Sequence, residues 1–236
     1  MQKTKSKKAL RVGAILLGVL LVCAAAFLLY TADYYRAEEE ALAVMTGETG
    51  VERRGKLTVL LPDYETDTGI VFYPGAKVEP EAYLPLLRQL RQEGVACVMA
   101  EMPFHMAIFA PDVALDAMAA VPAVEHWYIA GHSMGGAMAS QFAAENSAAV
   151  EGLILLGAYP YGEYPLEDTL TVYGSLNTSV AEKITYTENV VVIEGGNHAQ
   201  FGSYGPQKGD AEALITAEEQ QRITVEAIGD FLADRG

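Results

Sequence analysis

A serine framed by two glycines, in Gly131-His132-Ser133-Met134-Gly135, is the clearest chemical signal in this sequence. A serine hydroxyl becomes a useful nucleophile when a base removes its proton and when a sharp turn exposes it above a sheet. The flanking residues suit such a turn, because the apolar run 127–130 precedes it and the helix-forming run 137–142 follows it. The pattern predicts that Ser133 is a nucleophile between a strand and a helix.

The candidate base is His198, since it alone among the histidines follows Ser133 in the chain. It lies in Gly195-Gly196-Asn197-His198-Ala199-Gln200-Phe201, just after the last apolar run. A histidine in this place could take the serine proton and later deliver it to a leaving group. The other histidines have simpler explanations in the turn, before a strand or in a loop: His132, His126 and His105.

Acyl transfer through a serine also needs two N–H donors for the oxyanion of the tetrahedral intermediate. The backbone N–H of Met134, directly after the nucleophile, is the first candidate. The second is Ala76, or its neighbour Gly75, in the turn that follows the apolar run Ile70–Tyr73. An ordinary Pro-Gly turn is the alternative explanation for this second segment.

These residues require a framework of strands, and seven short apolar runs supply it. Runs this short, and apolar on both faces, are typical of central strands in a parallel sheet. They lie at Leu57–Leu61, Ile70–Tyr73, Val95–Ala100, Trp127–Ala130, Leu153–Leu156, Leu170–Tyr173 and Val190–Ile193.

Segments of helical length separate several of these runs. One begins near Pro80 and stops at Gly94, and the final one opens with the capping-box pattern Thr216-Ala217-Glu218-Glu219. Alternating strands and helices predict an α/β domain with a mostly parallel sheet over residues 51–236. The first strands, near 51–61, are joined too tightly for a crossover and should form an antiparallel edge.

A membrane anchor is expected before this domain, since residues 12–30 form a run of 19 residues without a charge. A helix of that length nearly spans a hydrocarbon core of roughly 30 Å. Five cations precede it within residues 1–11, which predicts a cytoplasmic N-terminus and a domain outside the membrane. Residues 31–50 then form a juxtamembrane tether. A cleaved signal peptide, or lipid attachment at Cys23, would leave the domain on the same side.

Charge and cysteine content exclude several function classes. From Asp33 onward the chain carries 11 basic and 31 acidic residues, so the domain should repel nucleic acid and anionic lipid surfaces. The two cysteines, Cys23 and Cys97, both lie in apolar runs and offer neither a disulfide framework nor metal-ligand spacing.

Three separate motifs, in this order, resemble a family of small bacterial α/β hydrolases described as dienelactone-hydrolase-like, or carboxymethylenebutenolidase-like. They are Phe72-Tyr73-Pro74-Gly75-Ala76-Lys77-Val78, the pentapeptide around Ser133, and residues 195–202. The likeness covers roughly residues 50–236. It implies an α/β-hydrolase fold, a Ser-acid-His triad, ester-type hydrolysis, and no metal or organic cofactor.

One position departs from that family's pattern. After the run Leu170–Tyr173 the family places an aspartate where this chain has Asn177. An amide can orient His198 but cannot stabilise its imidazolium with a full charge, and in a serine protease the equivalent change costs about 10⁴ in rate. Asn177 is the first candidate for the acid position, with Glu163 second and Glu194 third.

Three functions stay open at this point. The first is a serine hydrolase that cleaves a carboxylic ester or related acyl bond of a small substrate through an acyl-enzyme at Ser133. The second is a non-catalytic binding protein on the same fold, suggested by Asn177. The third is an acyltransferase, because its first half-reaction is the same. The short aromatic loop 159–165 and the lack of a long insertion favour an open site.

Overall fold

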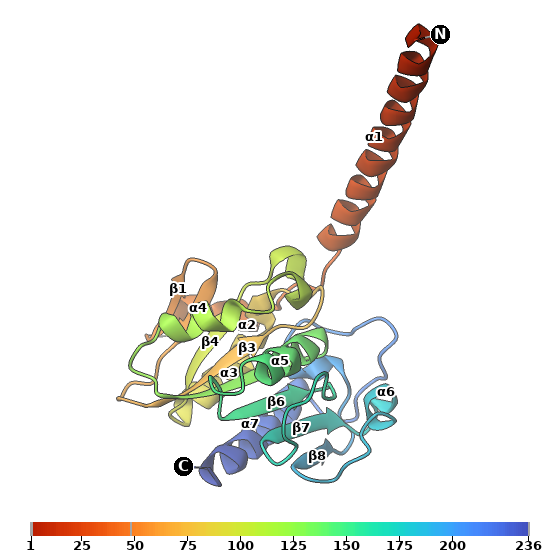
Figure 1. Cartoon of the computed structure of the whole chain (residues 1–236). Coiled ribbons are helices and arrows are strands. Elements are labelled where there is room, and N and C mark those ends of the chain that lie inside the picture. Colours follow the sequence, from red (N-terminus) through yellow and green to blue (C-terminus); the bar gives the residue numbers. More distant parts are fainter. Residues whose placement is uncertain (1, 48, 236) are drawn as a thin grey trace. The chain divides into compact units, whose positions relative to one another are not determined.

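The computed structural model describes residues 2–47 and 49–235, which form two units, Met1–Tyr34 and Tyr35–Gly236. The first unit is a single helix, α1 (Gln2–Ala32) (Figure 1). Its segment Leu10–Ala32 has a mean hydropathy of 2.9 and is long and apolar enough to cross a membrane. Length and composition are equally compatible with a signal sequence.

The second unit is built on an eight-stranded sheet in the order β1-β2-β4-β3-β5-β6-β7-β8. The strands are β1 (Val51–Arg54), β2 (Leu57–Leu60), β3 (Thr68–Tyr73), β4 (Ala96–Ala100), β5 (His126–His132), β6 (Gly152–Leu156), β7 (Thr169–Gly174) and β8 (Val190–Ile193). All seven apolar runs are strands, as predicted. Between β4 and β8 every pairing is parallel, which confirms the mostly parallel sheet.

The antiparallel edge lies where the sequence predicts it. β1 pairs with β2 through a tight connection, and β2 pairs antiparallel with β4. β1 is exposed along most of its length, whereas β2 is buried throughout. Because an edge strand has one unpaired side, the polar side chains of β1 help to keep other strands from adding to the sheet.

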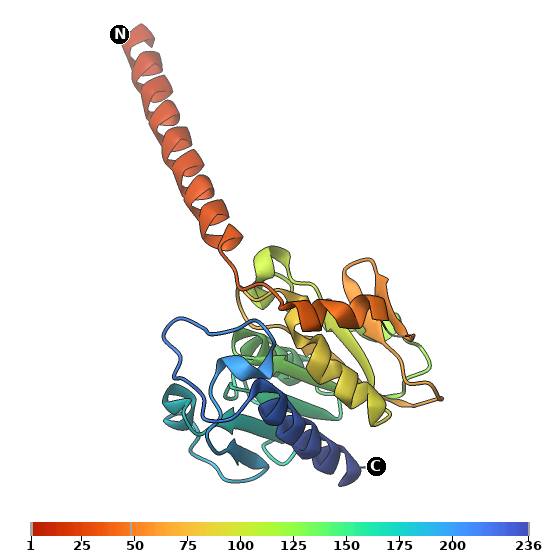
Figure 2. The same cartoon turned by 180° about the vertical axis from the view of Figure 1, so that it is seen from behind.

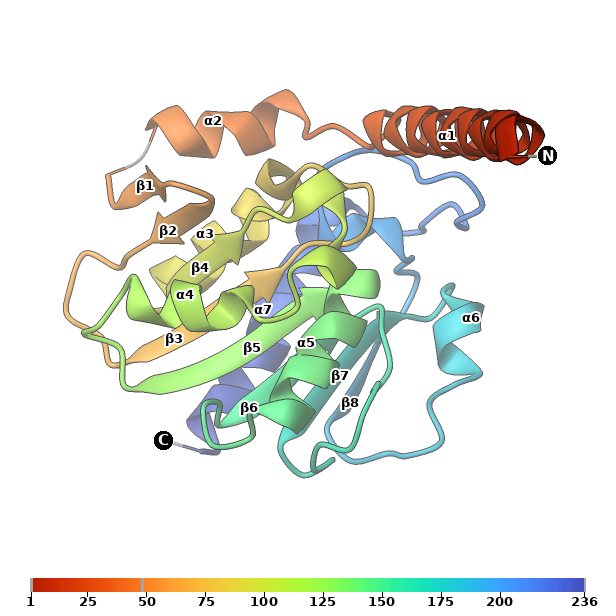
Figure 3. The ribbon, with the colours of Figure 1, turned by 45° about the horizontal axis from the view of Figure 1, so that its top comes forward.

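Helices cover both faces of the sheet, and each face has its own apolar core (Figures 2 and 3). On one face α3 (Leu84–Gln92) and α7 (Ala217–Ala233) bury residues such as Leu87 and Ile228. On the other face α4 (Val113–Ala119) and α5 (Met134–Glu145) bury Ala117 and Phe142. Short elements complete the unit: α2 (Glu39–Gly47), α6 (Thr178–Ala181) and the 3-10 turns η1 (Pro80–Tyr83), η2 (Pro103–His105), η3 (Ala107–Phe109) and η4 (Ala199–Phe201).

The capping box of the last helix forms as its sequence predicts. Thr216 adopts an extended backbone, and its side-chain oxygen accepts the N–H of Glu219 at 3.1 Å. This bond satisfies one of the N–H groups that a helix leaves without a partner in its first turn. It fixes where α7 begins.

Part of the segment expected to be a tether packs on the domain. Tyr35 joins the loop after β3, because its N–H donates to the carbonyl of Lys77 and its carbonyl accepts from Glu79. Ala41 and Val44, on α2, are buried. These apolar contacts explain why residues 35–47 belong to the second unit rather than to a flexible linker.

Candidate active site

Ser133 occupies a strained turn between β5 and α5. Its backbone angles, φ 53° and ψ −120°, lie outside the regions that non-glycine residues normally adopt. Such strain costs of order 1–3 kcal/mol and is concentrated at functional positions. Two backbone bonds hold the turn: the Ser133 N–H donates to Leu156 at 3.0 Å, and its carbonyl accepts from Ala137 at 3.1 Å.

The glycines around Ser133 are required by close backbone packing. A Cβ atom on Gly131 would lie 2.4 Å from the carbonyl carbon of Gly135. A Cβ on Gly135 would lie 2.1 Å from the carbonyl oxygen of Tyr73, at the end of β3. Neither contact is sterically possible, so the spacing of the pentapeptide follows from how tightly the elbow crosses the neighbouring strand.

Ser133 opens onto a cavity of about 670 Å³ at the carboxyl edge of the sheet. Its lining comes from the segments that follow β5, β6, β7 and β8, where side chains converge in α/β sheets. The lining residues are Ser133, Met134, Ala137, Gly157, Ala158, Tyr159, Tyr161, Asn177, Ser179, Val180, Lys183, His198, Gln207, Gly209 and Asp210. Ser133, His198 and Asn177 are therefore brought to one place from three separate segments.

Asn177 contacts His198, the candidate base. Its Nδ2 lies 2.8 Å from Nδ1 of His198, while its Oδ1 accepts the hydroxyl proton of Ser179 at 3.0 Å. With the amide nitrogen toward the ring, Nδ1 must accept, which leaves the neutral ring's proton on Nε2. Proton uptake from a serine requires the opposite tautomer, which forms when the amide turns over and presents its oxygen to Nδ1–H. An asparagine thus permits both states, whereas an aspartate would permit only the productive one.

In the described part of the chain, Ser133 and His198 share the cavity but form no hydrogen bond with each other. Catalytic hydrogen bonds are often long before substrate binds and shorten in the reacting complex. The Tyr159 and Tyr161 side chains at the rim are partly exposed and leave the cavity accessible.

The environment of His198 contains a carboxylate that the sequence reasoning missed. Asp210 accepts the backbone N–H of His198 at 3.2 Å through Oδ1 and that of Ala199 at 2.8 Å through Oδ2. Burial lowers the pKa of His198, and the Asp210 charge opposes that shift. The sequence does not point to Asp210, because it follows His198 by twelve residues and no motif marks it.

A buried chain of hydrogen bonds connects the elbow with the oxyanion loop and the base. The Gly75 N–H donates to Tyr83 Oη at 3.1 Å, Tyr83 Oη lies 2.7 Å from His132 Nδ1, and His132 Nε2 lies 3.0 Å from the carbonyl of His198. That carbonyl can only accept, so Nε2 carries the proton, Nδ1 accepts, and Tyr83 donates to it. Burial, together with the neighbouring His198, lowers the pKa of His132 well below its usual value, which keeps this ring neutral.

The two expected oxyanion donors differ in how directly they face the cavity. Met134 lines it and begins α5, so its N–H has no acceptor within the helix. Ala76 does not line it, although its loop packs against the elbow, since a Cβ on Gly75 would lie 2.8 Å from His132 Nδ1. The Gly75 N–H is already bonded to Tyr83, which leaves Ala76 as the candidate in this loop.

The two alternative acids lie away from His198. Glu163 and Glu194 are exposed, and neither lines the cavity. Asp168, the one aspartate between Ser133 and His198 in the sequence, precedes β7 and lies 3.9 Å from Nε of Arg235. Of the three candidates for the acid position, only Asn177 touches the base.

Among residues 2–47 and 49–235, no three His, Cys, Asp and Glu side chains come together as a metal-ligand set. Cys97 is buried in β4, and burial raises the pKa of its thiol. A buried, protonated thiol is a poor nucleophile and a poor ligand.

Comparisons with known proteins concern the family and the fold of the chain. The alpha/beta hydrolase family matches residues 69–222. Est1E from Butyrivibrio proteoclasticus is similar in structure, with a TM-score of 0.54, 18% identity, and coverage of 78% of this chain and 98% of that one. A soluble variant of monoglyceride lipase from Saccharomyces cerevisiae gives a TM-score of 0.54 at 10% identity, covering 80% of this chain and 96% of that one.

A predicted CIB-like hydrolase from Thermoplasma acidophilum is also similar, with a TM-score of 0.51, 19% identity, and coverage of 76% of this chain and 96% of that one. No match was found among curated proteins. At such identities the structural likeness concerns the fold, whereas the family match extends over most of the sheet and includes the elbow and the base. The chain belongs to the alpha/beta hydrolase family.

Proposed function

We propose that the protein is a serine hydrolase that cleaves a carboxylic ester or related acyl bond through an acyl-enzyme at Ser133. The observation that carries the proposal is the strained Ser133 in one cavity with His198, whose Nδ1 is contacted by Asn177. Strain of this kind persists only where the surrounding structure enforces it, and here it exposes a hydroxyl beside a base.

In the proposed reaction, His198 Nε2 accepts the Ser133 proton as Oγ attacks the substrate carbonyl carbon. The oxyanion that forms is stabilised by the Met134 N–H and by the N–H of Ala76. The imidazolium then protonates the leaving alcohol, which departs and leaves an acyl-Ser133 ester. Water, activated by the same histidine, hydrolyses this ester and frees the serine.

The proposed substrate is small, and the enzyme belongs to the dienelactone-hydrolase-like group of its family. The cavity of about 670 Å³ is open, with tyrosines at its rim. Est1E is known with ferulic acid bound, and the yeast monoglyceride lipase with a substrate analogue. Their names support an ester substrate class for a protein of the same fold.

The proposed location is the cell membrane. Residues 12–30 would span it as a single anchor, residues 1–11 would lie in the cytoplasm, residues 31–50 would follow the span outside, and the domain 51–236 would act there. The apolar helix segment Leu10–Ala32 and the five cations before residue 12 support this arrangement. A partner role for nucleic acid is not part of the proposal, since the domain is strongly acidic.

A fluorophosphonate probe tests the proposal directly. The full chain in detergent should be labelled at Ser133, and Ser133→Ala should abolish labelling. A folded wild-type protein that takes no label would overturn the hydrolase and favour the binding protein that Asn177 suggests. Labelling together with acyl transfer to an added alcohol, in excess over hydrolysis, would instead identify an acyltransferase.

A further inference from the structure

We infer that Asp210 is a positioning residue for the base, supplying near His198 the full negative charge that the neutral Asn177 lacks. The inference rests on the proposed function, because it assigns a role in the same proton transfer. It differs from the triad arrangement in one respect: the charged group holds the backbone of the base, while a neutral group contacts its ring.

The geometry of Asp210 is that of a clamp. Its two carboxylate oxygens accept consecutive backbone N–H groups, those of His198 and Ala199, at 3.2 and 2.8 Å. Oδ1 also accepts the N–H of Ala211 at 2.9 Å. The carboxylate itself lines the cavity with Ser133 and His198. It therefore fixes the main chain that carries the base and lies close enough to act on the base electrostatically.

The other groups near His198 cannot supply this charge. The His132 ring, on β5, has its centroid 4.6 Å away and is held neutral by its bonds to Tyr83 and to the His198 carbonyl. Lys183, after α6, lines the cavity and carries the opposite sign. Asn177 is neutral. Among the described residues that line this cavity, Asp210 is the one carboxylate.

The charge matters because the ring becomes an imidazolium during acyl transfer. Burial favours the neutral ring, and the Asp210 carboxylate acts in the opposite direction. A nearby negative charge both strengthens the base and stabilises the cation that forms after it accepts the serine proton. Removing that charge should weaken catalysis even where the backbone stays in place.

The test is the pH profile of kcat/KM on a simple aryl ester, measured with the full chain in detergent for the wild type and Asp210→Asn. The variant loses the charge and keeps one of the two side-chain acceptors for the backbone. We expect its plateau to fall about tenfold and the apparent pKa of the base to fall by about half a pH unit, since the imidazolium loses a favourable neighbour. Glu194→Gln is the matched control, because it removes an exposed carboxylate four residues before His198 that does not line the cavity.

A double variant separates the charge from a structural role. Asn177→Asp should raise kcat/KM by a larger factor in the Asp210→Asn background than in the wild type, because there it supplies the only carboxylate near the ring. Activity lost in Asp210→Asn with an unchanged profile, and an equal gain from Asn177→Asp in both backgrounds, would overturn the electrostatic role and leave Asp210 a structural contact. Unaltered kinetics would overturn the inference while fluorophosphonate labelling of Ser133 still supported the hydrolase.

Discussion

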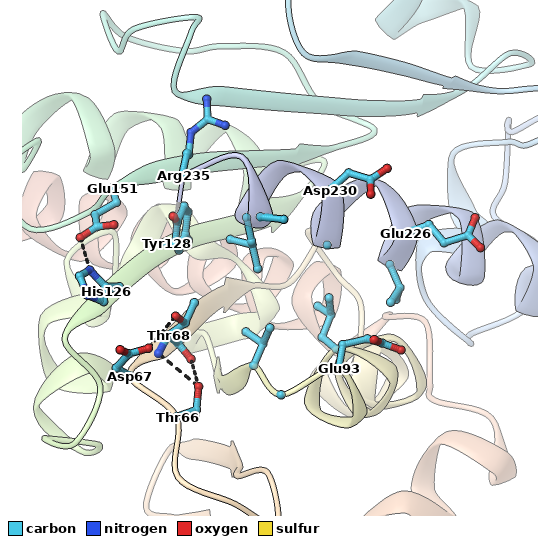
Figure 4. A pocket seen from close by; sticks show the side chains of 17 residues that line it. Thr66, Asp67, Thr68, Glu93, His126, Tyr128, Glu151, Glu226, Asp230 and Arg235 are labelled. Atoms are coloured by element: carbon cyan, nitrogen blue, oxygen red, sulfur yellow. Dashed lines mark hydrogen bonds and ion pairs between the residues drawn. The ribbon is translucent and has the colours of Figure 1, made fainter.

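The sheet has one cavity at the carboxyl ends of its strands, the carboxyl edge, and another at their amino ends, the amino edge. The larger of the two lies away from Ser133 and His198. The carboxyl edge holds the cavity of about 670 Å³ around Ser133, whereas a groove of about 1080 Å³ lies at the opposite edge, between the ends of α3 and α7 (Figure 4). The groove contains a histidine, His126, and five carboxylates: Asp67, Glu93, Glu151, Glu226 and Asp230.

The two cavities differ in how firmly their polar side chains are held, rather than in size or in residue type. At the amino edge His126 is exposed and paired with Glu151 at 2.6 Å, and the carboxylates are spread around the rim (Figure 4). At the carboxyl edge His132 is buried and His198 is half-buried, and both are bonded on defined atoms and lie in the segments around a strained serine. Reactivity requires groups that are held and desolvated, so cavity volume alone does not identify an active site.

Removing one histidine from each edge should give the largest difference in activity. His198→Ala should lower kcat/KM on an aryl ester by about 10⁴-fold or more, because the serine loses its base. His126→Ala should leave the rate near that of the wild type, since this exposed side chain belongs to the amino edge. Equal losses in both variants, or full activity in the first, would contradict the assignment of the site.

A second pair of variants tests which residue occupies the acid position. Asn177→Asp should raise kcat on the same ester by about tenfold or more, because a carboxylate enforces the productive tautomer and stabilises the imidazolium. Glu163→Gln, which changes an exposed carboxylate in the loop after β6, should have no effect. If Asn177→Asp is silent and Glu163→Gln is inactive, the role belongs to Glu163.

The smallest expected effect concerns stability and depends on the burial of His132. In the unfolded chain a histidine takes up a proton near pH 6.5, whereas burial keeps the folded ring neutral to much lower pH. The unfolded state therefore binds the extra proton, and stability is lost as pH falls below about 6.5, by about 1.4 kcal/mol per pH unit for one such group. His198 contributes in the same direction.

Denaturant unfolding between pH 7.5 and 5.5 measures this slope. His132→Gln should give a shallower dependence than the wild type, whatever its stability at pH 7.5, because one of the buried histidines is gone. His126→Ala should not flatten the slope, since the pKa of His126 is raised by Glu151 rather than lowered. Parallel slopes for the wild type and His132→Gln would show that His132 is not held neutral.

Local patterns in the sequence were sufficient for the strands and the elbow. The apolar runs are buried along most of their length, except in the edge strand β8, and the Gly-x-Ser-x-Gly spacing reflects backbone atoms that leave no space for a Cβ at Gly131 or Gly135. The runs and the pentapeptide are local patterns that a single sequence records, although the space at Gly135 is taken by Tyr73 of another strand. The place of His198, the candidate base, could be predicted for the same reason, because it follows the last strand closely.

Features that depend on long-range contacts could not be predicted in this way. Asp210 reaches back to His198 from a loop without a motif, and Tyr83 meets His132 across 49 positions. The packing of residues 35–47 on the domain could not be predicted from their mostly polar composition, since only a few of their side chains, such as Ala41, are buried. In each case one polar or small residue gains its role from a partner that the local pattern does not specify.

The bonded series from Gly75 through Tyr83 and His132 to His198 has a consequence for how the site moves. Its members come from the loop after β3, from η1, from β5 and from the residue before η4, yet each bond fixes the direction of the next. Loss of one would leave the others without a buried partner. The amide of Gly75 should therefore exchange with deuterium only when the whole series opens, and its exchange rate would report how often the resting site comes apart.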